Sequence, residues 1–191
     1  MNKKILITGC NGFISKKLFN LLVNYNYDVN CTNRNNIDKL HFDLNDSSDR
    51  IILPKFDILI HLAYFRNKSN SCESRVNIEG SKKIFEIAKK NNAKIIYISS
   101  QSADCMSHSS YGKTKYIIEK IAQKFDAYIL RPGLIYDVKT QLGLFGLIEK
   151  LILKSPILFV PSGLNKTFNL CNIDLLLDQI HQIILAKNTT N

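Results

Sequence analysis

A tyrosine and a lysine four residues apart are the first residues in this sequence whose spacing could support chemistry. Tyr111 and Lys115 fall in Tyr111–Phe125, where apolar residues recur at helical spacing, so both side chains lie on one face of a predicted helix. A phenol with a pKa of about 10 is a poor base at neutral pH, but a nearby ammonium group stabilises its ionised form. The pair could therefore exchange a proton with a bound hydroxyl, although the same spacing is common in surface pairs of amphipathic helices.

Two serines precede this helix at the end of an apolar run. The run Lys94–Ser99 predicts a buried strand, and Ser100 follows it directly. Ser99 would face the opposite side of the strand from Ser100. Taken alone, the pattern can be a serine pair that only ends a strand.

Two glycines mark the turn between the first predicted strand, Lys4–Thr8, and the first predicted helix, Phe13–Asn24. Glycine permits a tight turn and close approach of a pyrophosphate, whose charge is then met by the backbone N–H groups of the helix N-terminus. Ser15 stands where such turns have a third glycine or another small residue, and an ordinary glycine turn is the alternative. The residues predicted to bind a dinucleotide here are Gly9, Asn11, Gly12, Phe13 and Ile14.

The end of the second predicted strand distinguishes NAD from NADP. An acidic residue there would bind the ribose 2'-hydroxyl of NAD, and an arginine would accommodate the 2'-phosphate of NADP. The sequence has Asn33 and Arg34 at this point, so we expect NADP, with NAD as the alternative because Asn33 could bond an unphosphorylated ribose.

Short apolar runs alternate with amphipathic segments, which predicts an α/β fold: a doubly wound parallel Rossmann sheet with a small C-terminal substrate-binding appendage. The C-terminal part shows a helix-like run, an apolar run and a last helix. The predicted strands are Lys4–Thr8, Asp28–Thr32, Lys39–Phe42, Ile58–Leu62, Lys94–Ser99 and Tyr128–Arg131, and the predicted helices are Phe13–Asn24, Glu73–Asn91 and Tyr111–Phe125. The C-terminal segments are Leu142–Leu153, Ile157–Val160 and Asp174–Ala186.

Composition excludes several classes of protein. A chain of 191 residues with 45% hydrophobic content can bury one sizeable core, and its apolar runs are too short or interrupted to span a membrane. The net charge of +10 is lysine spread along the chain, so we expect no nucleic-acid partner. The five cysteines form no C-x-x-C pair and are odd in number, which argues against a complete disulfide framework and favours a cytoplasmic location. We expect no metal site.

The glycine turn and several later segments, in the same order, resemble the extended short-chain dehydrogenase/reductase family, also called the NAD-dependent epimerase/dehydratase family. The resemblance covers residues 5 to 136 and includes the Tyr-x-x-x-Lys pattern of Tyr111 and Lys115. The further segments are Asp43–Leu44, Ile60–Ala63, Val76–Ser81, Tyr97–Ser100 and Arg131–Tyr136.

The resemblance implies a role for each of these positions. Asp43 and Leu44 would lie beside the adenine, and the chain at Leu62, Ala63 and Tyr64 would lie along the adenosine. Lys115 would also hold the nicotinamide ribose, and Ser99 and Pro132 would line the cofactor site. Tyr111 would exchange the proton, and the Ser100 hydroxyl would hydrogen-bond the reacting oxygen and orient it toward Tyr111.

The resemblance further implies an enzyme that acts on a nucleotide-activated sugar, as in surface polysaccharide synthesis. Epimerase and reductase chemistry rank above dehydratase chemistry, because Gln101–Asp104 supplies only one acid. We expect an NAD(P)-binding domain over residues 1–136, an abbreviated substrate part over 137–191, and a homodimer formed by the helices Glu73–Asn91 and Tyr111–Phe125.

The alternative function is a non-catalytic NAD(P)-binding module, a redox sensor or interaction protein that kept the fold. The Tyr111, Lys115 and Ser100 set favours the enzyme, since a binding module needs no proton donor. The four histidines are interpreted as ordinary core or surface residues: His41, His61, His108 and His181.

Overall fold

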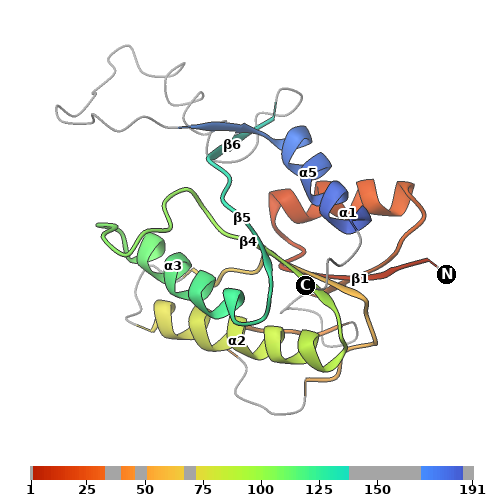
Figure 1. The fold of residues 1–191 in the computed structure, drawn as a ribbon, viewed down its shortest axis with the longest axis horizontal. Coiled ribbons are helices and arrows are strands. Elements are labelled where there is room, and N and C mark those ends of the chain that lie inside the picture. The colour runs from red at the N-terminus through yellow and green to blue at the C-terminus, as the bar shows by residue number, and fades with distance from the viewer. Residues whose placement is uncertain (1, 33–39, 46–50, 67–71, 138–168, 187–191) are drawn as a thin grey trace.

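The computed structural model describes residues 2–32, 40–45, 51–66, 72–137 and 169–186. Five parallel strands form a central sheet in the order β2-β1-β3-β4-β5, and a separate parallel pair joins β6 to β7 (Figure 1). The strands are β1 Lys4–Thr8, β2 Asp28–Thr32, β3 Ile58–His61, β4 Lys94–Ile98, β5 Tyr128–Leu130, β6 Leu134–Tyr136 and β7 Leu170–Asn172. The helices are α1 Phe13–Asn24, α2 Glu73–Lys90, α3 Ser110–Gln123 and α5 Ile173–Leu185. The predicted doubly wound parallel sheet is therefore confirmed.

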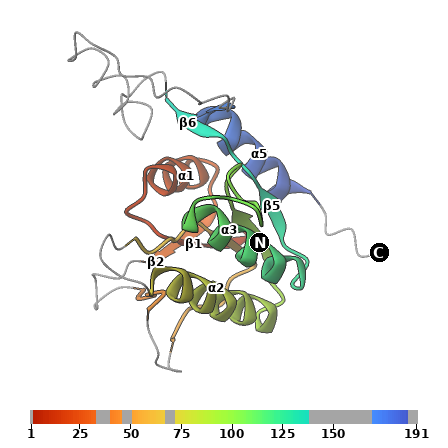
Figure 2. The same cartoon turned by 90° about the vertical axis from the view of Figure 1, so that its left-hand side faces the viewer.

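The two faces of the sheet bury alternate residues of the same strands. In β1, Ile5 and Ile7 pack toward α1 and α5, whereas Leu6 packs toward α2 and α3. Figure 2 shows these two helix pairs on opposite sides of the sheet. Because both faces are covered, the strands are apolar on both sides, which is the pattern of a buried parallel sheet.

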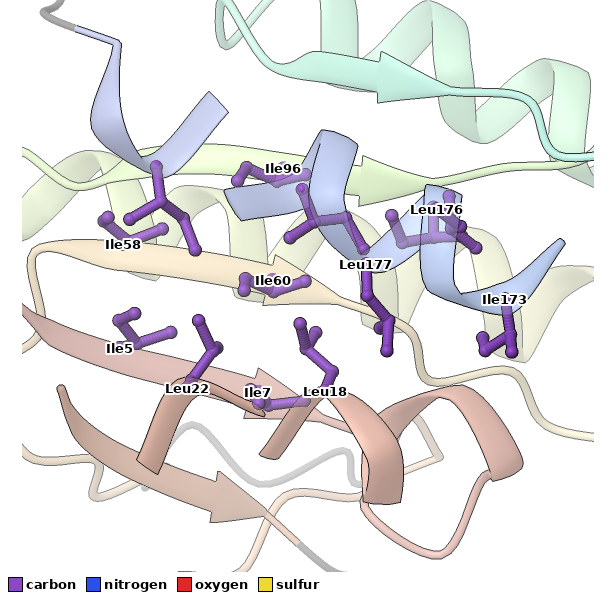
Figure 3. Close-up of a cluster of buried hydrophobic side chains, with 13 residues drawn as sticks. Ile5, Ile7, Leu18, Leu22, Ile58, Ile60, Ile96, Ile173, Leu176 and Leu177 are labelled. Carbon is purple, nitrogen blue, oxygen red and sulfur yellow. The ribbon is translucent and has the colours of Figure 1, made fainter. Parts of the chain in front are cut away.

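The last helix is part of the main core. Figure 3 shows Ile173, Leu176 and Leu177 of α5 against the strand side chains and α1. Burial of one large aliphatic side chain stabilises a fold by about 1.5–3 kcal/mol, so the buried face of α5 contributes substantially to stability. This helix belongs to the predicted substrate part, yet its apolar face completes the α1 side of the sheet.

The order of the strands sets where a ligand can bind. β1 has β2 on one side and β3 on the other, so the chain direction of the connections reverses between β1 and β3. In open α/β sheets, ligands bind outside the carboxyl ends of the strands at such a switch point. The turn after β1 and the loop after β3 meet at this place.

Most predicted elements agree with the structure within two residues, but the strand predicted at Lys39–Phe42 is wrong. Of its described residues, only His41 makes an isolated β-bridge. Phe42 and Leu44 are instead buried in the cluster beneath α2, so their apolar side chains are buried without a strand ladder.

Some expectations fall beyond what the structure describes. The segments Leu142–Leu153 and Ile157–Val160 lie outside the described residues, and the division at residue 137 stays a prediction. Among the described helices, none combines the length and apolar character that a membrane crossing requires.

Candidate functional site

The turn after β1 depends on glycine at its first position. Gly9 has φ of +81°, and a Cβ atom there would lie 2.8 Å from the Cα atom of Ala63, so no larger residue fits. The Gly12 N–H donates to the Gly9 carbonyl at 3.0 Å, and Gly12 is the N-cap of α1. Gly12 has no side chain to cap the helix, so the first amides of α1 are available to an anionic group.

Ser15 replaces the third small residue without opening the helix-strand contact. Its side chain is 1% exposed, and its hydroxyl donates to the Gly9 carbonyl at 2.8 Å. The serine therefore adds a hydrogen bond that holds the turn against α1.

The turn forms one wall of a cavity of about 350 Å³ at the switch point. Predicted cofactor residues that line it are Gly9, Asn11, Gly12, Asp43, Leu44, Leu62, Ala63 and Tyr64. Thr32 also lines it, and its buried hydroxyl has no hydrogen-bond partner among the described residues. A cavity with a glycine cradle and an unsatisfied buried hydroxyl fits a polar ligand such as a dinucleotide. Asn33 and Arg34 lie outside the described residues.

A close contact holds the Asp43–Leu44 segment at this cavity. A Cβ atom on Gly80 of α2 would lie 2.6 Å from the Leu44 carbonyl oxygen, so only glycine lets this segment lie against the helix. Gly80 therefore shapes the cavity indirectly, because it lets the Asp43–Leu44 segment of the cavity wall lie close to α2.

Two further cavities adjoin the first, since Leu62 and Arg66 line all three. The larger, of about 940 Å³, is bounded by Phe13, Ile14, Ser100 and Tyr111, among others. The smaller, of about 160 Å³, has further predicted site residues on its wall: Ile14, Ser99, Ser100, Tyr111, Lys115 and Pro132. The predicted catalytic residues thus lie beside the predicted cofactor site.

Ser100 and Tyr111 line the same two cavities. Ser109 caps α3 by accepting a hydrogen bond from the Gly112 N–H at 3.0 Å, which places Tyr111 in the first turn of the helix. Burial raises the pKa of Tyr111, while the hydrogen bond with Ser100 and the charge of Arg66 lower it. The serine was predicted to face Tyr111, and the structure brings the two side chains together.

Lys115 is 4% exposed and sits among aromatic rings. Its Nζ atom donates to the Ile98 carbonyl at 2.9 Å and lies 4.8 Å from the ring centre of Tyr97 and 5.3 Å from that of Tyr64. Burial lowers the pKa of Lys115 to about 7, with the charge of Arg66 acting in the same direction and Glu119 opposing it. Ring faces and the carbonyl are the groups that accept this ammonium inside the protein.

Glu119 and Arg131 form an ion pair that the sequence prediction missed. Glu119 lies one helical turn after Lys115 and is buried, and its carboxylate accepts two hydrogen bonds from the Arg131 guanidinium, one of 2.8 Å from Nε. The sequence did indicate that Glu119 lies on the same helix face as Tyr111 and Lys115, because the three residues are spaced four apart. The pair anchors the carboxyl end of β5 to α3, next to Pro132.

His61 is a core residue, as the sequence favoured. The Thr8 hydroxyl accepts hydrogen bonds from the N–H groups of Leu62 and Ala63, both at 3.2 Å, so its own proton must point to Nδ1 of His61 at 2.8 Å. Nε2 then carries the ring proton and donates to Ser81 at 3.0 Å. Burial, with the charge of Lys115, lowers the pKa of His61 to about 3, so the ring is neutral.

The cysteines bring one feature that the sequence did not predict. Cys10, in the glycine turn, and Cys31, in β2, form a disulfide with a Cα–Cα distance of 5.8 Å. Cys105 and Cys171 are free thiols. Within the described ranges, no group of three or more metal-ligating side chains comes together.

The chain is similar to known proteins over most of its length. A family profile described as "NAD dependent epimerase/dehydratase family" matches residues 5–136. A Methanocaldococcus jannaschii protein named "Putative UDP-glucose 4-epimerase" is 29% identical over 208 residues, covering 86% of this chain and 68% of that protein.

Two solved structures show the same fold. MoeE5 in complex with UDP-glucose and NAD has a TM-score of 0.75 at 19% identity, covering 97% of this chain and 73% of that one. The dTDP-4-dehydrorhamnose reductase of Bacillus anthracis in complex with NADP has a TM-score of 0.69 at 18% identity, covering 97% and 72%.

The Thr8 hydroxyl should be essential to the junction of β1 and β3. Thr8→Val keeps the shape but leaves two N–H groups and the His61 ring without a partner, so we expect the free energy of unfolding to fall by about 1–3 kcal/mol. Thr8→Ser keeps the hydroxyl and serves as the matched control. Urea unfolding of both variants checks this, and a Thr8→Val protein as stable as Thr8→Ser would contradict the assigned network.

Proposed function

Because the chain belongs to the NAD dependent epimerase/dehydratase family, we propose that it is an NAD(P)-dependent enzyme acting on a nucleotide-activated sugar. The observation that carries this proposal is that Ser100, Tyr111 and Lys115 line cavities adjoining the one at the glycine turn. A proton-transfer group and a bound dinucleotide could then act on the same substrate. A product of this kind would serve surface polysaccharide synthesis.

Each catalytic side chain has a separate task in this proposal. Tyr111 accepts the proton of a substrate hydroxyl or returns it, and Ser100 hydrogen-bonds the reacting oxygen and holds it toward the phenol. A bound nicotinamide supplies the hydride chemistry. Lys115, held by the Ile98 carbonyl, donates to the ribose hydroxyls.

Epimerisation or reduction suits the larger cavity better than dehydration does. Asp104 is the one carboxylate among the described residues that line it. Its Oδ1 atom accepts a hydrogen bond from the Met106 N–H at 2.6 Å, which ties the carboxylate to its own loop. Dehydration normally needs extra acids beside the catalytic hydroxyl, so we rank that reaction lowest.

The proposed cofactor is NADP, with its pyrophosphate at the Gly9–Gly12 turn. In calorimetric titrations, Gly12→Asp should weaken binding of both dinucleotides at least about tenfold, because a carboxylate opposes the pyrophosphate. Asn24→Asp adds the same charge at the far, exposed end of α1 and should bind as the wild type does.

The same titrations test the preference for NADP. Arg34→Ala should reduce the ratio of NADP to NAD affinity, since the guanidinium pairs with the 2'-phosphate. An unchanged ratio would make Arg34 a solvated charge, and no binding of either dinucleotide to wild type would contradict the cofactor assignment.

We place a homodimer interface on the outer faces of α2 and α3. Ile117 is 44% exposed, and Ile87 and Ile121 are partly buried. Ile84 of α2 does not belong to this surface, because it is fully buried in the core of its own subunit. An exposed isoleucine on α3, which packs against α2, fits a four-helix contact between two copies.

Light scattering at micromolar concentration should therefore give twice the chain mass of 21.8 kDa. Ile117→Lys should yield a monomer, because it buries a charge in the interface. Leu175→Lys changes an exposed position of α5, on the other side of the sheet, and should stay dimeric. A wild-type monomer would refute the interface.

The reaction itself is tested by pairs of variants on a panel of nucleotide sugars with NADPH or NAD. Tyr111→Phe should lower turnover by about 10²–10⁴-fold with little change in dinucleotide affinity, because only the hydroxyl is removed. Lys115→Met should reduce both. Tyr116→Phe and Lys113→Met alter the same residue types on α3 away from the cavities and should keep full activity.

Two outcomes would contradict the proposal. Full activity of Tyr111→Phe on a verified substrate would exclude its acid–base role. Wild-type protein that binds a dinucleotide but converts no sugar in either direction would favour the non-catalytic binding module instead.

A further inference from the structure

A disulfide joins two of the segments that form the first cavity, the one at the glycine turn. Cys10 lies in that turn and lines the cavity, and Cys31 in β2 directly precedes Thr32, which lines it as well. The buried hydroxyl of Thr32 has no hydrogen-bond partner among the described residues, so a polar ligand is expected beside it. The bridge therefore lies at the wall of the candidate cofactor site.

The two ends of the bridge differ in how firmly the fold holds them. Cys31 pairs with Ile7 in the parallel ladder of β1 and β2, and Thr32 pairs with Thr8. The turn has left this ladder, and the Cys10 N–H donates to the Thr32 carbonyl at 3.4 Å, which is long for such a hydrogen bond. The disulfide therefore supplies a firm link from the turn to β2 where hydrogen bonding is weak.

Reduction changes the distance between these two segments. Two unbonded sulfur atoms cannot lie as close together as two bonded ones, so the thiols must separate. Because the ladder holds Cys31, the larger movement falls on Cys10 and on the turn that lines the cavity. The carbonyl oxygen of Ile7 lies 3.6 Å from the Cys10 Sγ atom and can accept the proton of the reduced thiol.

The bridge is placed for exchange with thiols in solution rather than for support of the core. Both cysteines are partly exposed, and access to a sulfur atom is what an attacking thiolate requires. Leu18 and Leu22 hold α1 against the sheet, and β1 stays paired with β2, whether or not the sulfur atoms are bonded. We therefore expect reduction to change the turn and to leave the sheet intact.

We propose that Cys10 and Cys31 are a reversible redox pair that controls the affinity for the dinucleotide: the bridge holds the glycine turn in its binding conformation, and reduction releases it. A turn that is fixed beforehand loses less conformational freedom when the pyrophosphate binds. The proposal rests on the proposed cofactor site and adds a means of regulating that site.

The exchange requires only a small disulfide in one direction and a small dithiol in the other. To form the bridge, the two cysteine thiols give two electrons and two protons to the small disulfide, which leaves as two thiols. To break it, a thiolate of the dithiol attacks one sulfur atom and forms a mixed disulfide. The second thiol of the reagent then displaces the protein sulfur, so that the reagent becomes a disulfide and the protein regains both thiols.

The first test follows the thiols of the folded protein by alkylation and peptide mass spectrometry. Cys10 and Cys31 should become bridged to each other in glutathione disulfide and should be reduced together by dithiothreitol without denaturant. Cys105, an exposed free thiol, is the internal reference and should take no part in the bridge. A pair that stays reduced in glutathione disulfide, or that dithiothreitol reduces only after unfolding, would overturn the proposal.

The second test compares dinucleotide binding to the oxidised and the reduced protein by calorimetric titration. The oxidised form should bind NADP or NAD about tenfold more tightly. Cys31→Ser cannot form the bridge and should bind as the reduced wild type does in either condition, because Cys31 itself does not line the cavity. Cys105→Ser is the matched control and should keep the difference between the two forms.

Hydrogen exchange separates control of the turn from support of the whole fold. On reduction, the amides of residues 9–14 should exchange faster, while those of β3 and β4 stay protected. Loss of protection throughout the sheet would make the disulfide a brace for the fold and would overturn the proposal.

The outcomes distinguish this proposal from the proposed function. Equal affinity of the oxidised and reduced forms overturns the redox control and leaves the proposed enzyme unaffected. Affinity that depends on the bridge supports the control even if the protein converts no sugar. Absence of dinucleotide binding in both forms overturns both proposals.

Discussion

The site depends on the way that the Thr8 hydroxyl joins the ends of β1 and β3. One side-chain oxygen accepts the N–H groups of two successive residues after β3 and donates to a buried, neutral His61. These bonds hold Ala63 against the Gly9 turn, where a Cβ atom could not be accommodated. The cavity at the switch point is shaped by this contact, and the loop toward Arg66 starts from it.

Burial governs the electrostatics at the other end of the site. Lys115 is enclosed by rings and a carbonyl, so its ammonium carries a desolvation cost that lowers its pKa to about 7. Glu119 lies nearby and is itself neutralised by Arg131. Arg66, the other cation near Tyr111, is exposed and bears no comparable desolvation cost.

The core explains how α5 helps to keep the site in place. The sheet has apolar residues on both faces, and α5 covers the α1 side with residues such as Ile173 and Ile180. Without that cover, the side chains of β1 and β3 would be exposed to water on one face. The C-terminal helix thus supports the strands whose ends hold the candidate cofactor residues.

The sequence by itself determined the features that depend on neighbouring residues. Strand alternation, helical spacing, the glycine turn and the Tyr111–Lys115 pair could be predicted, because period and local conformation are properties of a short segment. The order of the segments also indicated the doubly wound sheet and the edge at which its ligand site lies. The strand predicted at Lys39–Phe42 does not form, because a short alternation of apolar residues can be buried by side-chain packing as well as by strand pairing.

Only the tertiary structure decided which groups meet across long separations. The contact of Arg66 with Tyr111, the chain from Thr8 through His61 to Ser81, and the Cys10–Cys31 pair each join segments far apart in the sequence. Such contacts depend on how loops leave the sheet and on which helix packs against them. Local periodicity contains no information about either, because it describes each segment without its neighbours in space.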